Sequence, residues 1–215
     1  MGIPVSKTQL YSGAFYDAIR RGCQRSAAAV VPLVLGQVGP IESVVDVGCG
    51  EGWWGRAFAD HRAAWNVTAL GIDGDYVDNP AIPMERIDLS QPFSLGREFS
   101  LAVCLEVAEH LDASRAESFV ADLVALAPTV VFSAAMPRQG GTHHVNCQPP
   151  AYWAALFREH DYGWEDTIRP RIWQHPDVES WYKSNLLIFR HGEGRLVEDP
   201  NHVIHPDLWL QPKSS

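Results

Sequence analysis

The sequence predicts an α/β protein built on a doubly wound, mostly parallel sheet. Three observations lead to this fold class. Short β-branched runs alternate with helical stretches, a glycine cluster directly follows the first of these runs, and two strand-like runs near the end lack a helix between them. The chain has 215 residues, a length that suits one compact domain.

The first predicted element is a helix over residues 10–37, where Phe15, Ile19, Val30 and Val34 recur at helical spacing. Short apolar and β-branched runs predict four strands, and amphipathic stretches predict three further helices. The strands are expected at 43–47, 67–72, 99–105 and 129–133, and the helices at 55–61, 113–127 and 150–160. This alternation places helices on both faces of a parallel sheet.

The end of the chain has a different pattern. Residues 163–173 and 181–190 are predicted as two strands joined by a short loop at 174–180. Adjacent strands without a crossover helix predict an antiparallel pair at the sheet edge. Three prolines in the last residues predict an extended tail. The expected organisation is therefore one domain, with a helical cap over 1–37, a core over 40–190 and a tail over 191–215.

Composition and charge exclude several classes of protein. The chain has 17 Lys and Arg against 26 Asp and Glu, a formal net charge of −9, which argues against non-specific nucleic-acid binding. The four cysteines, at 23, 49, 104 and 147, form no C-x-x-C pair, so a zinc ribbon and a thioredoxin-type motif are excluded. Scattered thiols are typical of a reduced protein, and we expect a cytoplasmic location.

One apolar segment needs separate treatment. Residues 27–35 follow three arginines, but Pro32 interrupts them and they lie far from Met1. We interpret this segment as a buried helix and not as a secretion signal. No run reaches the roughly 18 apolar residues that cross a bilayer, so we expect no membrane span.

The most informative segment is the glycine loop at 44–52, Val-Val-Asp-Val-Gly-Cys-Gly-Glu-Gly. Glycines between a strand and a helix allow a sharp turn and let a ligand touch the main chain, and the helix N-terminus offers free N–H groups. Trp53 stands where a dinucleotide G-x-G-x-x-G motif needs its third glycine. The loop also lacks the lysine of a P-loop.

Acidic residues at strand ends indicate a nucleoside ligand. Asp73 ends the second strand, where a carboxylate can accept both hydroxyls of a ribose. Asp88 can accept an adenine amine proton beside the apolar Leu89. Asp46, which precedes the glycines, is expected either to orient the loop or to meet a cationic ligand.

With these motifs, the chain resembles the class I S-adenosylmethionine-dependent methyltransferases, in their small bacterial single-domain form. The matching segments are 46–52, 71–73, 86–89 and 104–111, and the likeness covers about residues 40–190. It implies a Rossmann-like seven-stranded sheet with an antiparallel last strand, and S-adenosylmethionine as cofactor. The residues implied to bind it are Gly48, Gly50, Asp73, Asp88 and Leu89, with support from Asp46 and Glu106.

Methyl transfer is an in-line displacement, so the protein mainly positions the reacting groups. An amine attacks unaided, whereas a hydroxyl benefits from a nearby base or metal ion. Five proton-active side chains follow the fourth and fifth strands, and a helical segment at 106–110 would place the first three on one face. They are Glu106, Glu109, His110, His143 and His144.

Three interpretations of these side chains stay open. In the first, a divalent ion is held by Glu106, Glu109, His110 and either His143 or His144. This pattern resembles metal-dependent methyltransferases of small-RNA ends and of ubiquinone biosynthesis, and Mg²⁺, Mn²⁺ and Zn²⁺ suit it equally. In the second, His143 or His144 is a metal-free general base, with His110 as the next candidate. In the third, the pair at 109–110 is purely structural.

The acceptor side is less specific. The polar, glycine-rich loop at 139–150 is expected to form a pocket lip, with Asn146 and Gln148 available to bind hydroxyls. Several of the eight tryptophans can stack on a sugar or an aromatic ring, although core packing is the commoner role. An N-terminal lid carrying Tyr11, Phe15 and Tyr16 is a further hypothesis.

The predicted function is therefore S-adenosylmethionine-dependent O-methylation of a small molecule, such as a sugar or secondary metabolite. One alternative is an N-methyltransferase that needs no base, and another is a non-catalytic protein that binds the cofactor. Neither a nucleic acid nor a membrane is an expected partner. The sequence leaves a homodimer open.

Overall fold

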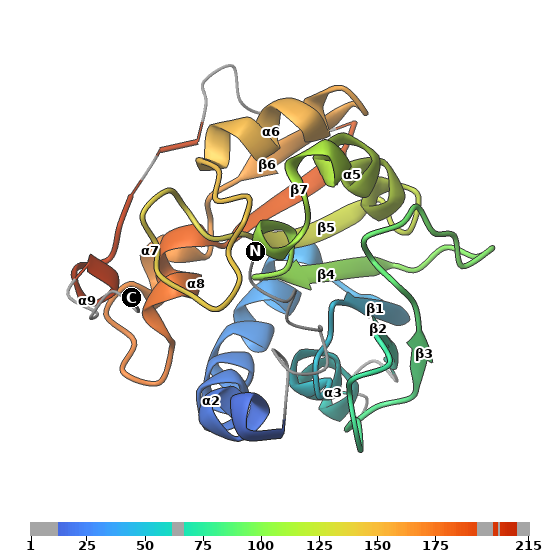
Figure 1. The fold of residues 1–215 in the computed structure, drawn as a ribbon, viewed down its shortest axis with the longest axis horizontal. Coiled ribbons are helices and arrows are strands. Elements are labelled where there is room, and N and C mark those ends of the chain that lie inside the picture. Colours follow the sequence, from blue (N-terminus) through green and yellow to red (C-terminus); the bar gives the residue numbers. More distant parts are fainter. Residues whose placement is uncertain (1–12, 62–66, 193–199, 202, 210–215) are drawn as a thin grey trace, which may run out of the picture.

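The computed structural model describes residues 13–61, 67–192, 200–201 and 203–209. A seven-stranded sheet runs through the molecule, with strand order β3-β2-β1-β4-β5-β7-β6 (Figure 1). The strands are β1 Ser43–Val47, β2 Thr68–Asp73, β3 Met84–Arg86, β4 Leu101–Leu105, β5 Thr129–Ser133, β6 Tyr162–Glu165 and β7 Leu187–His191. Strands β1 to β5 pair in parallel, and β7 is antiparallel to both of its neighbours. The doubly wound sheet and its antiparallel closure are confirmed.

Helices cover both faces of this sheet. They are α2 Gly13–Val38, α3 Trp53–Asp60, α5 Ala116–Val124, α6 Pro150–Arg158, α7 Arg169–Ile172, α8 Ser180–Asn185 and α9 Pro206–Trp209, with short 3-10 turns η1 Ala108–His110 and η2 Ala113–Arg115. None of the described helices is long and apolar enough to cross a membrane.

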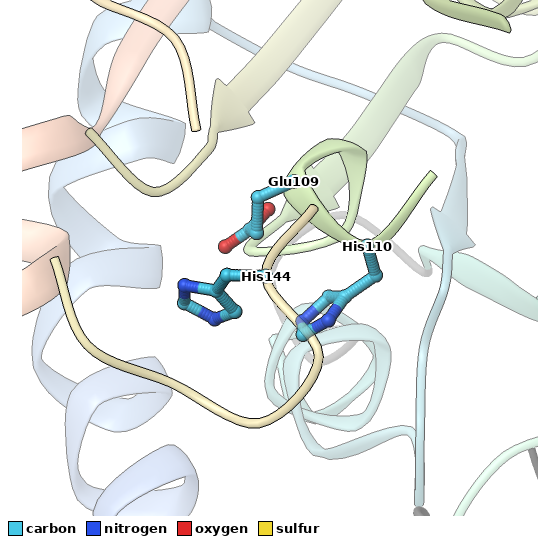
Figure 2. Close-up of side chains that lie close together, drawn as sticks. All are labelled: Glu109, His110 and His144. Atoms are coloured by element: carbon cyan, nitrogen blue, oxygen red, sulfur yellow. The ribbon is translucent and has the colours of Figure 1, made fainter. Parts of the chain in front are cut away.

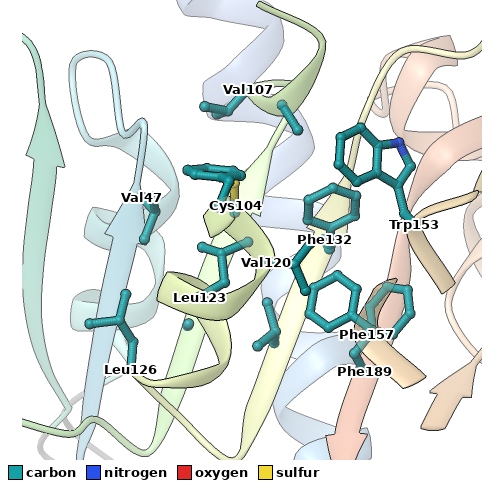
Figure 3. Packing of buried hydrophobic residues seen from close by; sticks show 14 of the residues in the cluster. Val47, Cys104, Val107, Val120, Leu123, Leu126, Phe132, Trp153, Phe157 and Phe189 are labelled. Atoms are coloured by element: carbon teal, nitrogen blue, oxygen red, sulfur yellow. The ribbon is translucent and has the colours of Figure 1, made fainter. Parts of the chain in front are cut away.

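Two buried clusters hold these layers together. On one face, α5 and α6 pack on the sheet, and the Phe157 ring stacks on Phe189 with 3.9 Å between ring centroids (Figure 3). On the other face, α2, α3, α7 and α8 bury apolar side chains such as Val31, Phe58 and Ile172. The hydrophobic effect therefore stabilises the sheet from both sides, as the near-continuous apolar strands require.

The segment between β6 and β7 differs from the prediction. Residues 169–172 form α7 and residues 180–185 form α8, where the sequence predicted two long strands and a short loop. The buried Arg169 guanidinium explains the compact path, because it binds Asp166 through two nitrogens and also reaches the carbonyl of Ser184. This side chain joins the two short helices and ends β6 early.

Two further elements were not predicted. The three-residue strand β3 lies at the sheet edge with mostly exposed side chains, so no apolar alternation marks it. In the predicted extended tail, residues 206–209 form α9. The buried His205 directly before it donates its main-chain N–H to the Ser184 hydroxyl, 2.9 Å away, and so attaches this part of the tail to α8.

The glycine loop connects β1 to α3. Gly48, Gly50 and Gly52 all have positive φ angles, of 70°, 51° and 80°, which favour residues without a Cβ. Asp46 lies behind the loop, 4% exposed, and its carboxylate accepts a hydrogen bond from the Gly55 N–H at 2.8 Å. This bond satisfies one of the free N–H groups at the start of α3. Burial raises the pKa of Asp46 to about 7.

Asp46 is therefore expected to make the fold less stable as pH rises. Its carboxyl holds a proton more tightly in the folded chain, so its contribution to the free energy of unfolding is full below the unfolded pKa of 3.8 and is lost as pH rises through about 7. The Asp46→Asn variant removes this contribution, so urea unfolding across this pH range is expected to show a smaller loss of stability than in the wild type.

The matched control is Asp112→Asn. Hydrogen bonds from Ser114 lower the pKa of the exposed Asp112 below 3.8, so this variant is expected to keep the wild-type pH dependence between pH 3.8 and about 7. If the free energy of unfolding depends on pH equally in the wild type and in Asp46→Asn, the raised pKa of Asp46 is contradicted.

Candidate active site

A cavity of about 880 Å³ lies at the carboxyl edge of the parallel strands. It is lined from the ends of β1, β2 and β4, from the loop after β5, and from helices α2, α8 and α9. The strand order reverses between β1 and β4, and ligands of open α/β sheets bind outside this reversal point. The volume is in the usual range for a small-molecule site.

Most of the predicted nucleoside-binding residues line this cavity. They are Gly48, Gly50, Asp73, Asp88 and Leu89, together with Glu106. Asp46 is the exception, because its carboxylate holds the start of α3 and does not reach the lining. Of its two predicted roles, orientation of the loop therefore fits its position, and direct contact with a ligand does not.

Asp73 connects the glycine loop to the end of β2. Its carboxylate accepts the N–H of Gly50 at 2.7 Å, the N–H of Gly74 at 2.7 Å and the hydroxyl of Tyr76 at 2.6 Å. Tyr76 also lines the cavity, and the sequence prediction missed it. Its position three residues after the predicted ribose acid was the only signal for it.

Gly48 has no room for a side chain. Its φ is positive, and a Cβ there would overlap the side chain of Val107, which also lines the cavity. The loop therefore brings main-chain atoms to the cavity surface, as the glycine pattern predicted.

An ion pair attaches α2 to the same loop. Arg20 of α2 donates to Glu51 through two nitrogens, with 2.8 Å between Nε and Oε2, and also lies 2.8 Å from Asp17. Glu51 accepts a further bond from the Trp53 indole, and the arginine lowers the pKa of Glu51. The sequence did not indicate Arg20 as a cavity residue, because its partner is 31 positions away.

Glu106 has an environment that differs from the prediction. Its φ is +56°, and only 108–110 are helical, so 106, 109 and 110 do not form one helical face. Its carboxylate accepts bonds from the Asn185 amide at 3.0 Å and the Gln139 amide at 2.9 Å. Burial raises the pKa of Glu106.

Three other predicted side chains converge. Glu109, His110 and His144 each offer one donor atom, and these atoms lie within 4.8 Å of one another (Figure 2). Glu109 is 0% exposed, and burial together with the neighbouring Glu106 raises the pKa of its carboxyl well above the usual value. Burial and nearby His144 lower the pKa of His110 to about 4, and burial lowers the pKa of His144. Both imidazoles are therefore neutral near pH 7.

Main-chain bonds bring these side chains together. The carbonyl of Glu109 in η1 accepts the N–H groups of Val145 and Asn146, at 2.8 and 3.0 Å, so the loop after β5 packs on η1. His143 lines the cavity but is not part of the three-residue group, and its carbonyl lies 3.3 Å from the His110 ring. Of the two histidines that the sequence left open, His144 is the one near Glu109.

Other acceptor-side predictions have mixed outcomes. Asn146 and Gln148 hydrogen-bond to each other and do not line the cavity, so their predicted contact with an acceptor is wrong. Trp53, Trp54 and Trp181 do line it. Tyr11 lies outside the described residues, as do the side chains of Phe15 and Tyr16, so the lid stays a hypothesis.

The same fold occurs in solved methyltransferase structures. An O-methyltransferase family protein from Burkholderia thailandensis aligns with a TM-score of 0.65 and 16% identity, over 88% of this chain and 61% of that one. DesVI from Streptomyces venezuelae aligns at 0.62 and 17% identity, over 88% of this chain and 100% of that one. CalS10, an amino pentose methyltransferase from Micromonospora echinaspora, aligns at 0.61 and 16% identity, over 89% and 99%.

Sequence comparison adds nothing further. No protein-family profile matches the chain, and no curated protein matches it. This chain spans about three fifths of the Burkholderia protein's length and nearly all of the other two. At these identities the likeness defines architecture alone: the chain has the fold of the class I S-adenosylmethionine-dependent methyltransferases.

Proposed function

We propose that the protein is an S-adenosylmethionine-dependent methyltransferase that acts on a hydroxyl of a small molecule. We further propose that Glu109, His110 and His144 hold a divalent ion beside the acceptor. The observation that carries this proposal is the convergence of Glu109, His110 and His144: a fully buried carboxyl and two neutral imidazoles whose donor atoms lie within 4.8 Å of one another.

The cavity supports the choice of cofactor. Asp73 and Asp88 line the cavity with the positive-φ glycines, which supports the proposal that they hold the ribose and the adenine of a nucleoside. When bound, the cofactor supplies an electrophilic methyl group. The protein's task is then to orient the acceptor oxygen and to exclude water, and the partly enclosed cavity serves both.

The donor set fits a metal ion. An isolated buried carboxylate is costly unless it is paired, protonated or bound to a metal, and imidazoles ligate only when neutral. One carboxylate with two imidazoles suits Mn²⁺ or Zn²⁺, whereas Mg²⁺ prefers oxygen ligands throughout. Such an ion, when bound, lowers the pKa of a coordinated hydroxyl. Glu106 is not assigned as a ligand, because amide groups already satisfy its carboxylate.

A metal-free histidine base is the second candidate. It is favoured by the position of His144 on the cavity wall. His110 is the weaker base, because a pKa of about 4 is far below the working pH at which a general base is most effective.

Gly48→Ala is expected to abolish binding of S-adenosylmethionine and of its demethylated product in calorimetry. The added Cβ meets Val107, and the positive φ disfavours it. The matched control is Gly39→Ala, which has an equally positive φ of 83° but open space around the new Cβ. It is expected to carry the same backbone strain and bind normally. If both variants bind S-adenosylmethionine equally, the glycine loop is not its binding site.

Glu109→Gln is expected to weaken Mn²⁺ binding by at least about 100-fold, because even outer-shell partners of metal sites change affinity by about 10- to 100-fold. Electron paramagnetic resonance of free Mn²⁺ measures this loss, and methylation of a hydroxyl acceptor is expected to fall with it. Glu117→Gln, on the exposed side of α5, is the control. Full turnover after chelation would favour the histidine base.

A further inference from the structure

The cavity extends beyond the residues assigned to the nucleoside. Asp73 ends β2 and Asp88 follows β3, on one side of the reversal point, whereas α8 leads into β7 on the other side. Trp181 and Tyr182 of α8 line the cavity there, with Leu208 of α9 and Ile19 of α2. We call these four residues the α8 wall. The α8 wall borders the helix that follows the glycine loop, because Tyr182 contacts Trp54 of α3.

The aromatic surface of the α8 wall is fixed in place. Tyr182 is 4% exposed, and its ring meets the edge of Trp54 at 4.9 Å between centroids. The Tyr182 hydroxyl accepts the Trp54 indole N–H at 3.2 Å, so the polar ends of the two side chains satisfy each other. The half-buried Trp181 ring lies 5.8 Å from the Tyr182 ring. Since Tyr182 is buried, the ring surface that remains for a ligand is that of the half-buried Trp181, which suits a flat partner.

Acidic residues outnumber basic ones in the described lining of the cavity. Its described lining contains six acidic residues, at 51, 73, 75, 88, 106 and 109, and two arginines. Arg20 is paired with Glu51 and Asp17, and Arg86 lies on β3 and donates to the carbonyl of Val77. Both described arginines of the lining therefore already have partners, and the acidic surplus disfavours a phosphate or carboxylate.

We infer that the acceptor is an uncharged or cationic small molecule whose ring packs on the α8 wall, and that phosphorylated molecules and RNA ends are not substrates. This inference rests on the proposed function, since it concerns the acceptor of that methyl transfer. Trp181 is the specificity-determining residue, because it is the most accessible aromatic side chain of the wall.

The test uses the full chain saturated with demethylated cofactor and three probes that share one ring. They are 2-phenylethanol, 2-phenylethylamine and phenylacetate, and their dissociation constants are measured by ligand-observed nuclear magnetic resonance. We expect the neutral and cationic probes to bind at least about tenfold more tightly than the anion. A difference of this size is what the lack of one charge-assisted hydrogen bond to the anion would produce. A short single-stranded RNA is expected not to bind, with or without Mn²⁺.

Two variants separate the α8 wall from the rest of the fold. Trp181→Ala is expected to weaken binding of the neutral and cationic probes about tenfold, because loss of one stacking contact costs about that much affinity. The demethylated cofactor is expected to bind as it does to the wild type. Tyr152→Ala, a half-buried aromatic residue of α6 outside the cavity, is the matched control. Leu208→Arg adds a cation to the wall and is expected to reverse the preference in favour of phenylacetate.

Each contrary outcome has a distinct meaning. Failure of the demethylated cofactor to bind the wild type overturns the proposed function itself. If that cofactor binds, then preference for phenylacetate, binding of the RNA, failure of both non-anionic probes at millimolar concentration, or unchanged affinity in Trp181→Ala overturns the inference about the acceptor alone.

Discussion

The geometry of the site depends on the carboxylate of Asp73 and on the groups that donate hydrogen bonds to it. By accepting the Gly50 N–H, it ties the glycine loop to the end of β2, and its bonds to Gly74 and Tyr76 fix the turn that follows. The loop can keep three left-handed glycines because this bond, together with the Asp46 contact behind it, holds both of its ends. The positions of Arg20 and α2 follow, since Glu51 belongs to the same loop.

Two glutamates three positions apart have opposite environments. Glu106 is satisfied by side-chain amides from two other segments, whereas the Glu109 carboxylate is buried without such partners among the described residues. The positive φ at 106 turns the chain between the end of β4 and η1, and the two carboxyls still interact, since Glu106 contributes to the raised pKa of Glu109. One acid therefore stabilises the wall of the cavity, and the other is left available for an ion.

Much of the fold was predictable because its signals are local. The β-branched strands, the glycine loop and the strand-end acids are each marked within a few residues, and all of them lie where expected. The α7–α8 segment was mispredicted because its aromatic and apolar residues resemble strands, and only the buried Arg169 contacts reveal its helices. Arg20, Tyr76 and the separation of Glu106 depend on long-range pairing or backbone dihedrals, which residue spacing does not encode.

The position of α8 has a consequence for how such a fold diversifies. The two short helices between β6 and β7 belong to a connection outside the parallel half of the sheet, and the first three strands with their loops form the opposite end of the cavity. Insertions or replacements in that connection would leave the register of the first three strands undisturbed. Chains with this fold would thus vary one wall of the cavity while the glycine loop and the strand-end acids keep their positions.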